Sequence, residues 1–277
     1  MSAPGNLVRP QTDYRHPWPV RIWHWANVLA VVVLLLTGLL LFDIHPRLYW
    51  GNDGHEGVPA FLSLSATDLE GTVPKTELQI GGHRWDATGV LGKIIDDGFG
   101  GKYLLVFSPP DDWDFGATRG WHFAFAWILA FSLLGYASYV LVSGRLAKKL
   151  LPMRTDLTLR GIAHEIWQHL RLRPAHGQAA RHYNVLQKLS YLFVIFVLIP
   201  TIILSGLTMS NTVTAAFPDL FTLFGGRQSA RSMHFFAAML LVLFVLVHVF
   251  EVFVAGFVNL MRSMITGRYV VDREDSV

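Results

Sequence analysis

Four long apolar runs constrain the fold of this chain more than any other feature of its sequence. They cover residues 23–42, 121–142, 190–209 and 233–258, and polar, proline-rich or glycine-rich sequence bounds each of them. About 20 helical residues cross the roughly 30 Å of hydrocarbon in a bilayer. Because lipid offers the backbone no hydrogen-bond partner, each run must be helical. The sequence therefore predicts an all-α membrane protein, a single domain over 1–277 built as a four-transmembrane-helix bundle.

Composition narrows the chemistry that such a bundle can carry. The chain is 52% hydrophobic and 16% charged, which is typical of membrane proteins, and it contains no cysteine. A chain without cysteine holds no thiolate iron–sulfur cluster, c-type haem or disulfide, so histidine is the available ligand for a redox centre. The first apolar run is too long for a cleavable signal peptide and is expected to be retained. No motif for nucleotide binding, nucleophilic catalysis or nucleic-acid recognition is present.

The charges between the apolar runs predict the orientation of the chain in the membrane. Loop 145–188 holds nine Lys/Arg against two acids, and residues 1–22 hold three against one. Loop 43–118 has the opposite balance, with twelve Asp/Glu against five Lys/Arg. The positive-inside rule therefore predicts that both termini and loop 145–188 are cytoplasmic. The long loop 43–118, between the first and second helices, is then extracytoplasmic, where it serves either as a solvated acidic cap or as a docking surface for a partner.

Histidines lie at matching depths in the apolar runs. In the fourth run, His234 and His248 are fourteen residues apart, which places them ~21 Å apart along a helix and about 40° short of four full turns. They face the same side, one near each membrane surface. Depth then predicts the opposing partners, His122 for His234 at the outer level and His24 for His248 at the inner level. Four ligands in two pairs suit two b-type haems, each held by two imidazoles.

Two alternatives to haem ligation remain open for these histidines. A single histidine near a helix end is often only an interfacial polar residue. A histidine-lined metal transporter would require carboxylates or other polar groups near the middle of the membrane. Glu251 is the nearest such group, and it lies toward the inner end of its helix.

Three of the four histidines follow an arginine by three residues. The pairs are Arg21 with His24, Arg119 with His122, and Arg231 with His234. This spacing places a guanidinium about one turn nearer the membrane surface, where haem propionates would lie, and arginine is suited to bind carboxylates. The alternative is that these side chains simply extend to the interface at helix ends.

These segments resemble the di-haem cytochrome b subunits of nickel–iron hydrogenases, formate dehydrogenases and thiosulfate reductases. The resemblance covers all four helices and leaves out most of loop 43–118, which is longer than in the compact formate dehydrogenase type. The matching segments are Arg21-Ile-Trp-His24-Trp with the later Thr37-Gly38, Arg119-Gly-Trp-His122-Phe, Tyr183-Asn184-Val185-Leu186-Gln187-Lys188, and Arg231-Ser-Met-His234-Phe with His248. The segments 227–231 and 261–267 are closer to relatives that pair with molybdopterin enzymes.

The resemblance implies a subunit of a bacterial-type inner membrane, not catalytic alone, that passes electrons between an extracytoplasmic oxidoreductase and the quinone pool. The partner would be a molybdopterin oxidoreductase, a hydrogenase or a similar enzyme, and the quinone ubiquinone or menaquinone. In the family a polar contact to quinone falls on Asn184, with Gln187 nearby. Equally, Asn184 can cap the third helix with Gln187 as the second member of a capping box. A stand-alone di-haem enzyme that acts on a small external acceptor is the alternative function.

Overall fold

The computed structural model describes residues 11–55, 57–67, 74–96, 102–107, 114–152, 157–158, 161, 163, 165–167, 171 and 184–271. Its contacts divide the chain into two compact units. The first unit comprises Met1–Asn27, Ser132–Leu198 and Leu241–Val277, and the second comprises Val28–Phe131 and Ile199–Leu240. Most of loop 145–188 lies outside the described residues.

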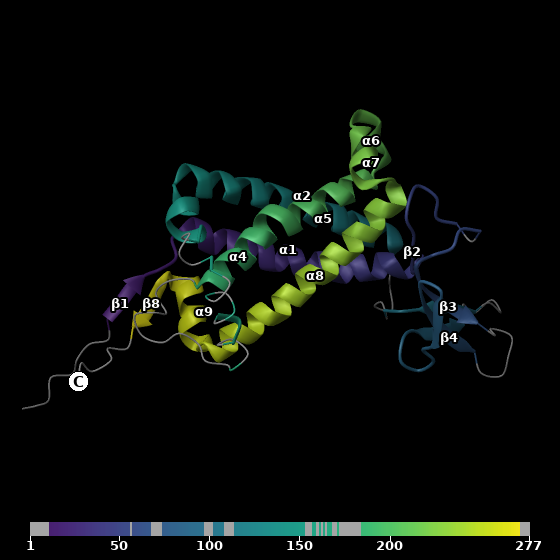
Figure 1. Ribbon diagram of the computed structural model, residues 1–277, viewed down its shortest axis with the longest axis horizontal. Coiled ribbons are helices and arrows are strands. Elements are labelled where there is room, and N and C mark those ends of the chain that lie inside the picture. Colours follow the sequence, from purple (N-terminus) through teal and green to yellow (C-terminus); the bar gives the residue numbers. More distant parts are fainter. Residues whose placement is uncertain are drawn as a thin grey trace, which may run out of the picture. The chain divides into compact units, whose positions relative to one another are not determined.

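Among the residues that the structure describes, four helices are long and apolar enough to cross a membrane, as predicted. The first, second and fourth spans are the single helices α1 (Trp18–Asp43), α2 (Phe115–Val142) and α8 (Arg227–Val254), which are labelled in Figure 1. Only 11% of the most apolar window of each of these helices is buried within the protein, so their surfaces are available to lipid. Each helix begins five or six residues before the predicted run, because hydropathy marks the lipid-facing part and not the polar first turns.

The third span, Val185–Thr208, is built from three consecutive helical segments. These are α4 (Val185–Phe193), the π-helical segment η3 (Val194–Leu198) and α5 (Ile199–Thr208). Pro200, two residues after the end of η3, has no backbone N–H to donate to the preceding turn. A π-helical turn accommodates such a break in the hydrogen-bond ladder.

The sequence had predicted one helix to residue 258 in the fourth apolar run, but the helix ends earlier. Helix α8 ends at Val254, and Gly256 has a φ of 103°, a left-handed conformation that favours glycine. The chain then turns into a separate amphipathic helix, α9 (Phe257–Thr266). Hydropathy continues across this break because α9 keeps one apolar face.

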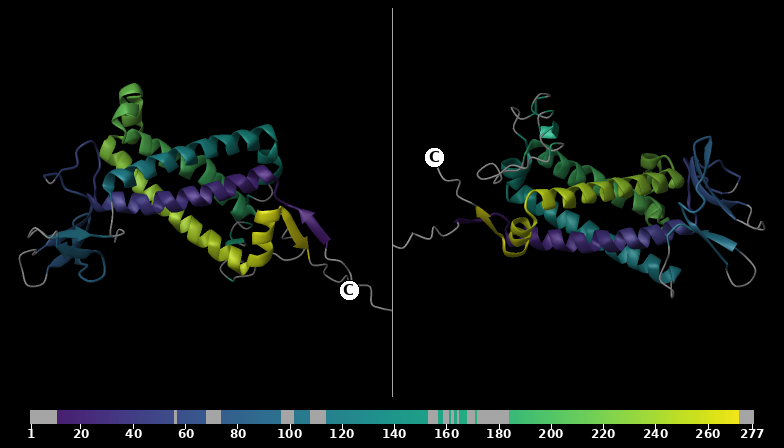
Figure 2. Two further views of the ribbon diagram at one scale, coloured as in Figure 1. Left: turned by 180° about the vertical axis from the view of Figure 1, so that it is seen from behind. Right: turned by 90° about the horizontal axis from the view of Figure 1, so that it is seen from below.

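A two-stranded sheet joins the two ends of the described chain within the first unit. Strand β1 (Gln11–Tyr14) pairs antiparallel with β8 (Arg268–Val271), as Figure 2 shows. Asn259 in α9 donates to the carbonyl of Val270 at 2.7 Å and accepts from its N–H at 3.0 Å. The first unit also contains a short π-helical segment, η1 (Leu146–Leu150).

Loop 43–118 of the second unit contains β-strands, so the prediction of an all-α fold was wrong for this segment. Its strands are β2 (Arg47–Leu48), β3 (Leu62–Thr67), β4 (Lys75–Ile80), β5 (His83–Asp86), β6 (Lys93–Asp96) and β7 (Lys102–Leu105). The first four form one sheet in chain order, and the last two form a hairpin. Short strands separated by glycine-rich turns give a weak sequence signal, which explains why they were not predicted.

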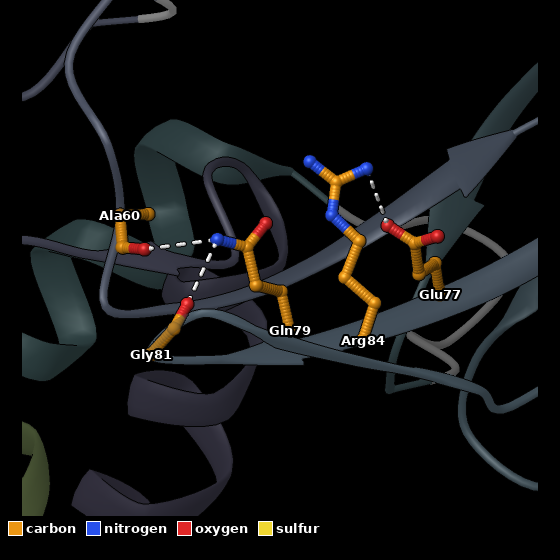
Figure 3. A network of polar contacts seen from close by, with 5 residues as sticks. All are labelled: Ala60, Glu77, Gln79, Gly81 and Arg84. Carbon is orange, nitrogen blue, oxygen red and sulfur yellow. Dashed lines mark hydrogen bonds and ion pairs between the residues drawn. The ribbon is translucent and has the colours of Figure 1, made fainter.

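Side chains also brace the turn between β4 and β5. The amide of Gln79 donates to the carbonyls of Gly81 at 3.1 Å and Ala60 at 3.4 Å, and Arg84 lies 3.4 Å from Glu77 (Figure 3). The ion pair is largely exposed and contributes at most about 1 kcal/mol. The backbone-directed amide therefore does more to fix this hairpin than the ion pair does.

Further polar contacts attach the start of α8 to the segment that follows α1. Two short helices, α6 (Asn211–Ala216) and α7 (Asp219–Phe224), lead into α8. The fully buried Ser232 donates to the carbonyl of Tyr49 at 2.7 Å, and the backbone N–H groups of Gln228 and Ser229 bond the carbonyl of Gly51. These contacts hold the first turns of α8 in place and so fix the positions of Arg231 and His234.

Candidate functional site

The first unit brings together His24 of α1 and His248 of α8. The centroids of the two imidazoles are 6.4 Å apart, and the ring planes are inclined by 71°. Phe244, one turn before His248, stacks on its ring with centroids 5.9 Å apart. The residues therefore meet in the combination that depth had predicted.

The second unit brings together His122 of α2 and His234 of α8 in nearly the same geometry. Their ring centroids are 6.3 Å apart, and the ring planes are inclined by 62°. Each unit thus holds one histidine pair. In both pairs α8 supplies one ring, while the opposing ring comes from α1 in the first unit and from α2 in the second.

The separation of the rings matches what two imidazoles need to bind one metal ion between them. A metal–imidazole nitrogen bond is about 2.0 Å and the nitrogen lies about 1 Å from the ring centre, so two ligated rings have centroids about 6 Å apart. Both pairs meet this requirement. The donor set is also suitable for haem, because neutral imidazole is an established axial ligand of haem iron.

Neighbouring helices contact the pair of His122 and His234 through the Nδ1 atom of each ring. The hydroxyl of Thr37 lies 2.9 Å from Nδ1 of His122. Nδ1 of His234 lies 2.8 Å from the carbonyl of Ile202 and 3.2 Å from the hydroxyl of Ser205. In both rings Nε2 is therefore the nitrogen available to a metal.

Glycines next to those hydroxyls let the helices approach the rings closely. A Cβ atom at Gly38 would lie 3.3 Å from Cε1 of His122, and one at Gly206 would lie 3.2 Å from Cε1 of His234. The sequence had singled out Thr37 and Gly38, but Ser205 and Gly206 were missed. The signal was present, since both pairs place a hydroxyl residue directly before glycine inside an apolar run.

The three predicted propionate ligands occupy different surroundings. Arg231 donates to the carbonyl of His45 at 2.5 Å, and Arg21 donates to the carbonyl of Ile265. The guanidinium of Arg119 lies over Phe123, 5.2 Å from its ring centroid. Within the described part of the chain, Nε of Arg21 is buried without a hydrogen-bond partner. A buried donor of this kind would suit a carboxylate, so a propionate contact remains a prediction for Arg21 in particular.

Asn184 and Gln187 form the capping box at the start of α4. The side-chain oxygen of Asn184 accepts from the N–H of Gln187 at 2.8 Å, and the side-chain oxygen of Gln187 accepts from the N–H of Asn184 at 3.3 Å. The capping role is therefore confirmed, and the quinone contact remains a prediction. Tyr183, which begins the motif, lies outside the described residues.

A comparison with protein families identifies the family to which a chain with these histidine pairs belongs. The family model described as prokaryotic cytochrome b561 matches residues 15–267, a range that contains both histidine pairs and all four spans. The chain belongs to the prokaryotic cytochrome b561 family. The resemblance found in the sequence is thereby confirmed, and the protein is a membrane cytochrome that carries haem b and serves in electron transport.

Individual relatives of this cytochrome include subunits of two kinds of enzyme complex. A putative protein-methionine-sulfoxide reductase subunit, YedZ1 of Azospira oryzae, is 33% identical over 234 residues, which are 84% of this chain and 87% of the relative. A probable Ni/Fe-hydrogenase B-type cytochrome subunit of Azotobacter chroococcum is 25% identical over 255 residues, 88% of this chain and 81% of the relative. No solved structure matches the chain.

Proposed function

We propose that this cytochrome is a di-haem subunit that transfers electrons between an extracytoplasmic oxidoreductase and the quinone pool of the inner membrane. The observation that carries the proposal is the pair of histidine contacts, at 6.4 Å in the first unit and 6.3 Å in the second. One such pair would supply the ligands of one haem. Two pairs, each with one ring from α8, would supply the ligands of two.

The residues have separate roles in this proposal. His24 and His248 would hold the inner haem, His122 and His234 would hold the outer haem, and Arg21, Arg119 and Arg231 would bind the propionates. Haem held by two histidines takes up and releases single electrons without a change of ligand. Because all four imidazoles are attached to long helices, little reorganisation accompanies the change of charge.

The quinone contact is proposed for the start of the third span. The oxygens of the Asn184 and Gln187 side chains are both used by the capping box. The amide NH₂ group of Gln187 can still donate a hydrogen bond to a quinone carbonyl. Either ubiquinone or menaquinone presents such a carbonyl.

The partner is proposed from the names of the relatives. The relative with 33% identity is described as a subunit of a protein-methionine-sulfoxide reductase, whereas the hydrogenase cytochromes share 25%. We therefore propose an extracytoplasmic reductase partner, a molybdopterin oxidoreductase, in preference to a hydrogenase. A stand-alone di-haem enzyme is the alternative, and it differs by needing no bound partner. For a metal transporter, no group of three or more metal-binding side chains occurs among the residues that the structure describes.

Haem quantitation in single-histidine variants tests the proposal. We expect about two b-type haems per chain by pyridine haemochrome assay, and about one in both His122→Ala and His24→Ala. The exposed His83 of β5 stacks on Trp85 and belongs to neither pair, so His83→Ala is the matched control and should keep both haems. Full haem content in His122→Ala would contradict the pairing. Co-purification of an oxidoreductase subunit with the intact cytochrome would favour the subunit role over the stand-alone enzyme.

A further inference from the structure

Two helices present the same arrangement of polar groups to the outer histidine pair. In α1, Thr37 precedes Gly38, and in α5, Ser205 precedes Gly206. The ring of His234 bonds the hydroxyl of Ser205 and the carbonyl three residues before it, at Ile202. The hydroxyl of Thr37 contacts the ring of His122 and, like the hydroxyl of Ser205, bonds the carbonyls three and four residues before it. One local arrangement is therefore used twice, once for each outer ligand.

The hydrogen bonds of Thr37 determine which nitrogen of His122 carries the proton. A hydroxyl has one hydrogen to donate. The Thr37 hydroxyl donates to the carbonyl of Val33 at 2.7 Å, because a carbonyl oxygen can only accept. It must then accept at its 2.9 Å contact with His122, so the hydrogen of that contact lies on Nδ1 of the imidazole. Nε2 of His122 is left with its lone pair for a metal.

The same reasoning applies to His234 with independent contacts. The Ser205 hydroxyl donates to the carbonyl of Thr201 at 2.6 Å. Nδ1 of His234 lies 2.8 Å from the carbonyl of Ile202, which cannot donate, so this Nδ1 also carries hydrogen. Ser205 is completely buried, and no solvent competes for its hydroxyl. Both outer imidazoles are thus held as the tautomer that can bind iron through Nε2.

We propose that Thr37 and Ser205 are positioning residues that orient the two outer haem ligands and set the reduction potential of that haem, and that Thr37 also fixes the tautomer of His122. This inference rests on the proposed ligation by His122 and His234. A hydrogen bond from Nδ1–H to an oxygen makes the imidazole a more basic ligand, which stabilises the oxidised iron. Hydroxyl and carbonyl groups do so more weakly than a carboxylate would, because they are uncharged.

Removal of the two hydroxyls, alone and together, tests this inference. Thr37→Val removes the hydroxyl acceptor of His122, and Thr37→Ser keeps it. Ser205→Ala removes one of the two acceptors of His234, and the 2.8 Å bond to the carbonyl of Ile202 remains. The control is Thr208→Val, since Thr208 is also completely buried in α5 and donates to the carbonyl of Leu204 at 2.8 Å. Spectroelectrochemical titration of the purified cytochrome gives the midpoint potential of each haem, and the component that is absent in His122→Ala identifies the outer one.

We expect the outer midpoint potential to rise in Thr37→Val and in Ser205→Ala, and to rise further in the double variant. The inner potential should not change, and Thr37→Ser and Thr208→Val should behave like the unaltered protein. Loss of the outer haem to an apoprotein acceptor should become about tenfold faster, as is typical when the partner of a metal-bound histidine is removed. Unchanged outer potentials, or equal shifts of both haems, would overturn the inference. A haem content below two per chain in the unaltered protein would instead contradict the proposed function, on which this inference rests.

Discussion

At the scale of single residues, Gly206 and Gly135 differ in the room that they leave for a side chain. A Cβ atom at Gly206 would lie 3.2 Å from Cε1 of His234, whereas one at Gly135 would make an ordinary contact, 3.5 Å from the ring of Trp23. An added methyl group at Gly206 must displace either the imidazole or the helix, and such overpacking costs about 1–3 kcal/mol. We therefore expect Gly206→Ala to lose the outer haem selectively, as measured by haemochrome assay and redox difference spectra.

The control for this prediction is Gly135→Ala, which introduces the same methyl group in another span. It should retain both haems and the thermal stability of the unaltered protein in detergent. Gly38→Ala, where the Cβ would lie 3.3 Å from His122, should behave like Gly206→Ala. Equal haem content in Gly206→Ala and Gly135→Ala would show that the glycines serve only general helix packing.

At the scale of elements, the sequence predicted the positions of the transmembrane helices well, but it did not predict the strands of loop 43–118. Hydropathy located all four spans because about twenty apolar residues in succession have few alternative structures. The capping box at Asn184 was also readable, since it depends on residues only three apart. The break at Gly256 was not readable, because it depends on backbone conformation. The pairing of β1 with β8 was not readable either, because the paired residues are about 250 positions apart in the chain.

The candidate site was also predictable in part: the histidine pairs were predicted, and the contacts around them were not. Helix spacing and depth were enough to pair the four histidines. The hydroxyl–glycine pair of Ser205 and Gly206 was readable in the sequence, but its contact with His234 was not, because no pattern shows which face of the third span meets α8. The positions of the arginines also required the structure, since only it reveals that Arg21 and Arg231 bond backbone carbonyls.

The β1–β8 sheet is expected to weaken in acid because of His16. The pKa of His16 is lowered from 6.5 to about 4, mainly by burial and in addition by the charges of Arg15 and Arg145. The folded sheet holds His16 neutral, whereas the opened segment protonates below about pH 6.5. Stability from this group is therefore complete above pH 6.5 and declines as the pH falls toward 4. The expected loss at pH 5 is roughly 2 kcal/mol.

Hydrogen exchange of residues 12–14 and 268–270 measures this effect. After correction for the intrinsic exchange rates, protection should be lower at pH 5 than at pH 7.5. In His16→Gln, which cannot titrate, the protection should be independent of pH over this range. If the variant showed the same decline as the unaltered protein, another group would be responsible.

At the scale of the whole molecule, the distribution of charge indicates how the cytochrome is oriented. Loop 43–118 carries twelve acids and five bases, whereas loop 145–188 carries nine bases and two acids. If the positive-inside rule holds, electrons enter or leave through the outer pair on the side of loop 43–118. The proposed quinone contact near Asn184 then belongs to the cytoplasmic half, and the proposed partner enzyme lies on the side of loop 43–118.

The natural absence of cysteine allows this orientation to be tested with single introduced thiols. Val90 in the outer loop is 82% exposed, and Arg268 in β8 is also exposed. In right-side-out membrane vesicles, a membrane-impermeant maleimide should label Val90→Cys but not Arg268→Cys, and detergent should make both reactive. The cysteine-free parent should remain unlabelled throughout. Labelling of Arg268→Cys in sealed vesicles would place the C-terminal strand outside and would move the proposed quinone site to the opposite membrane surface.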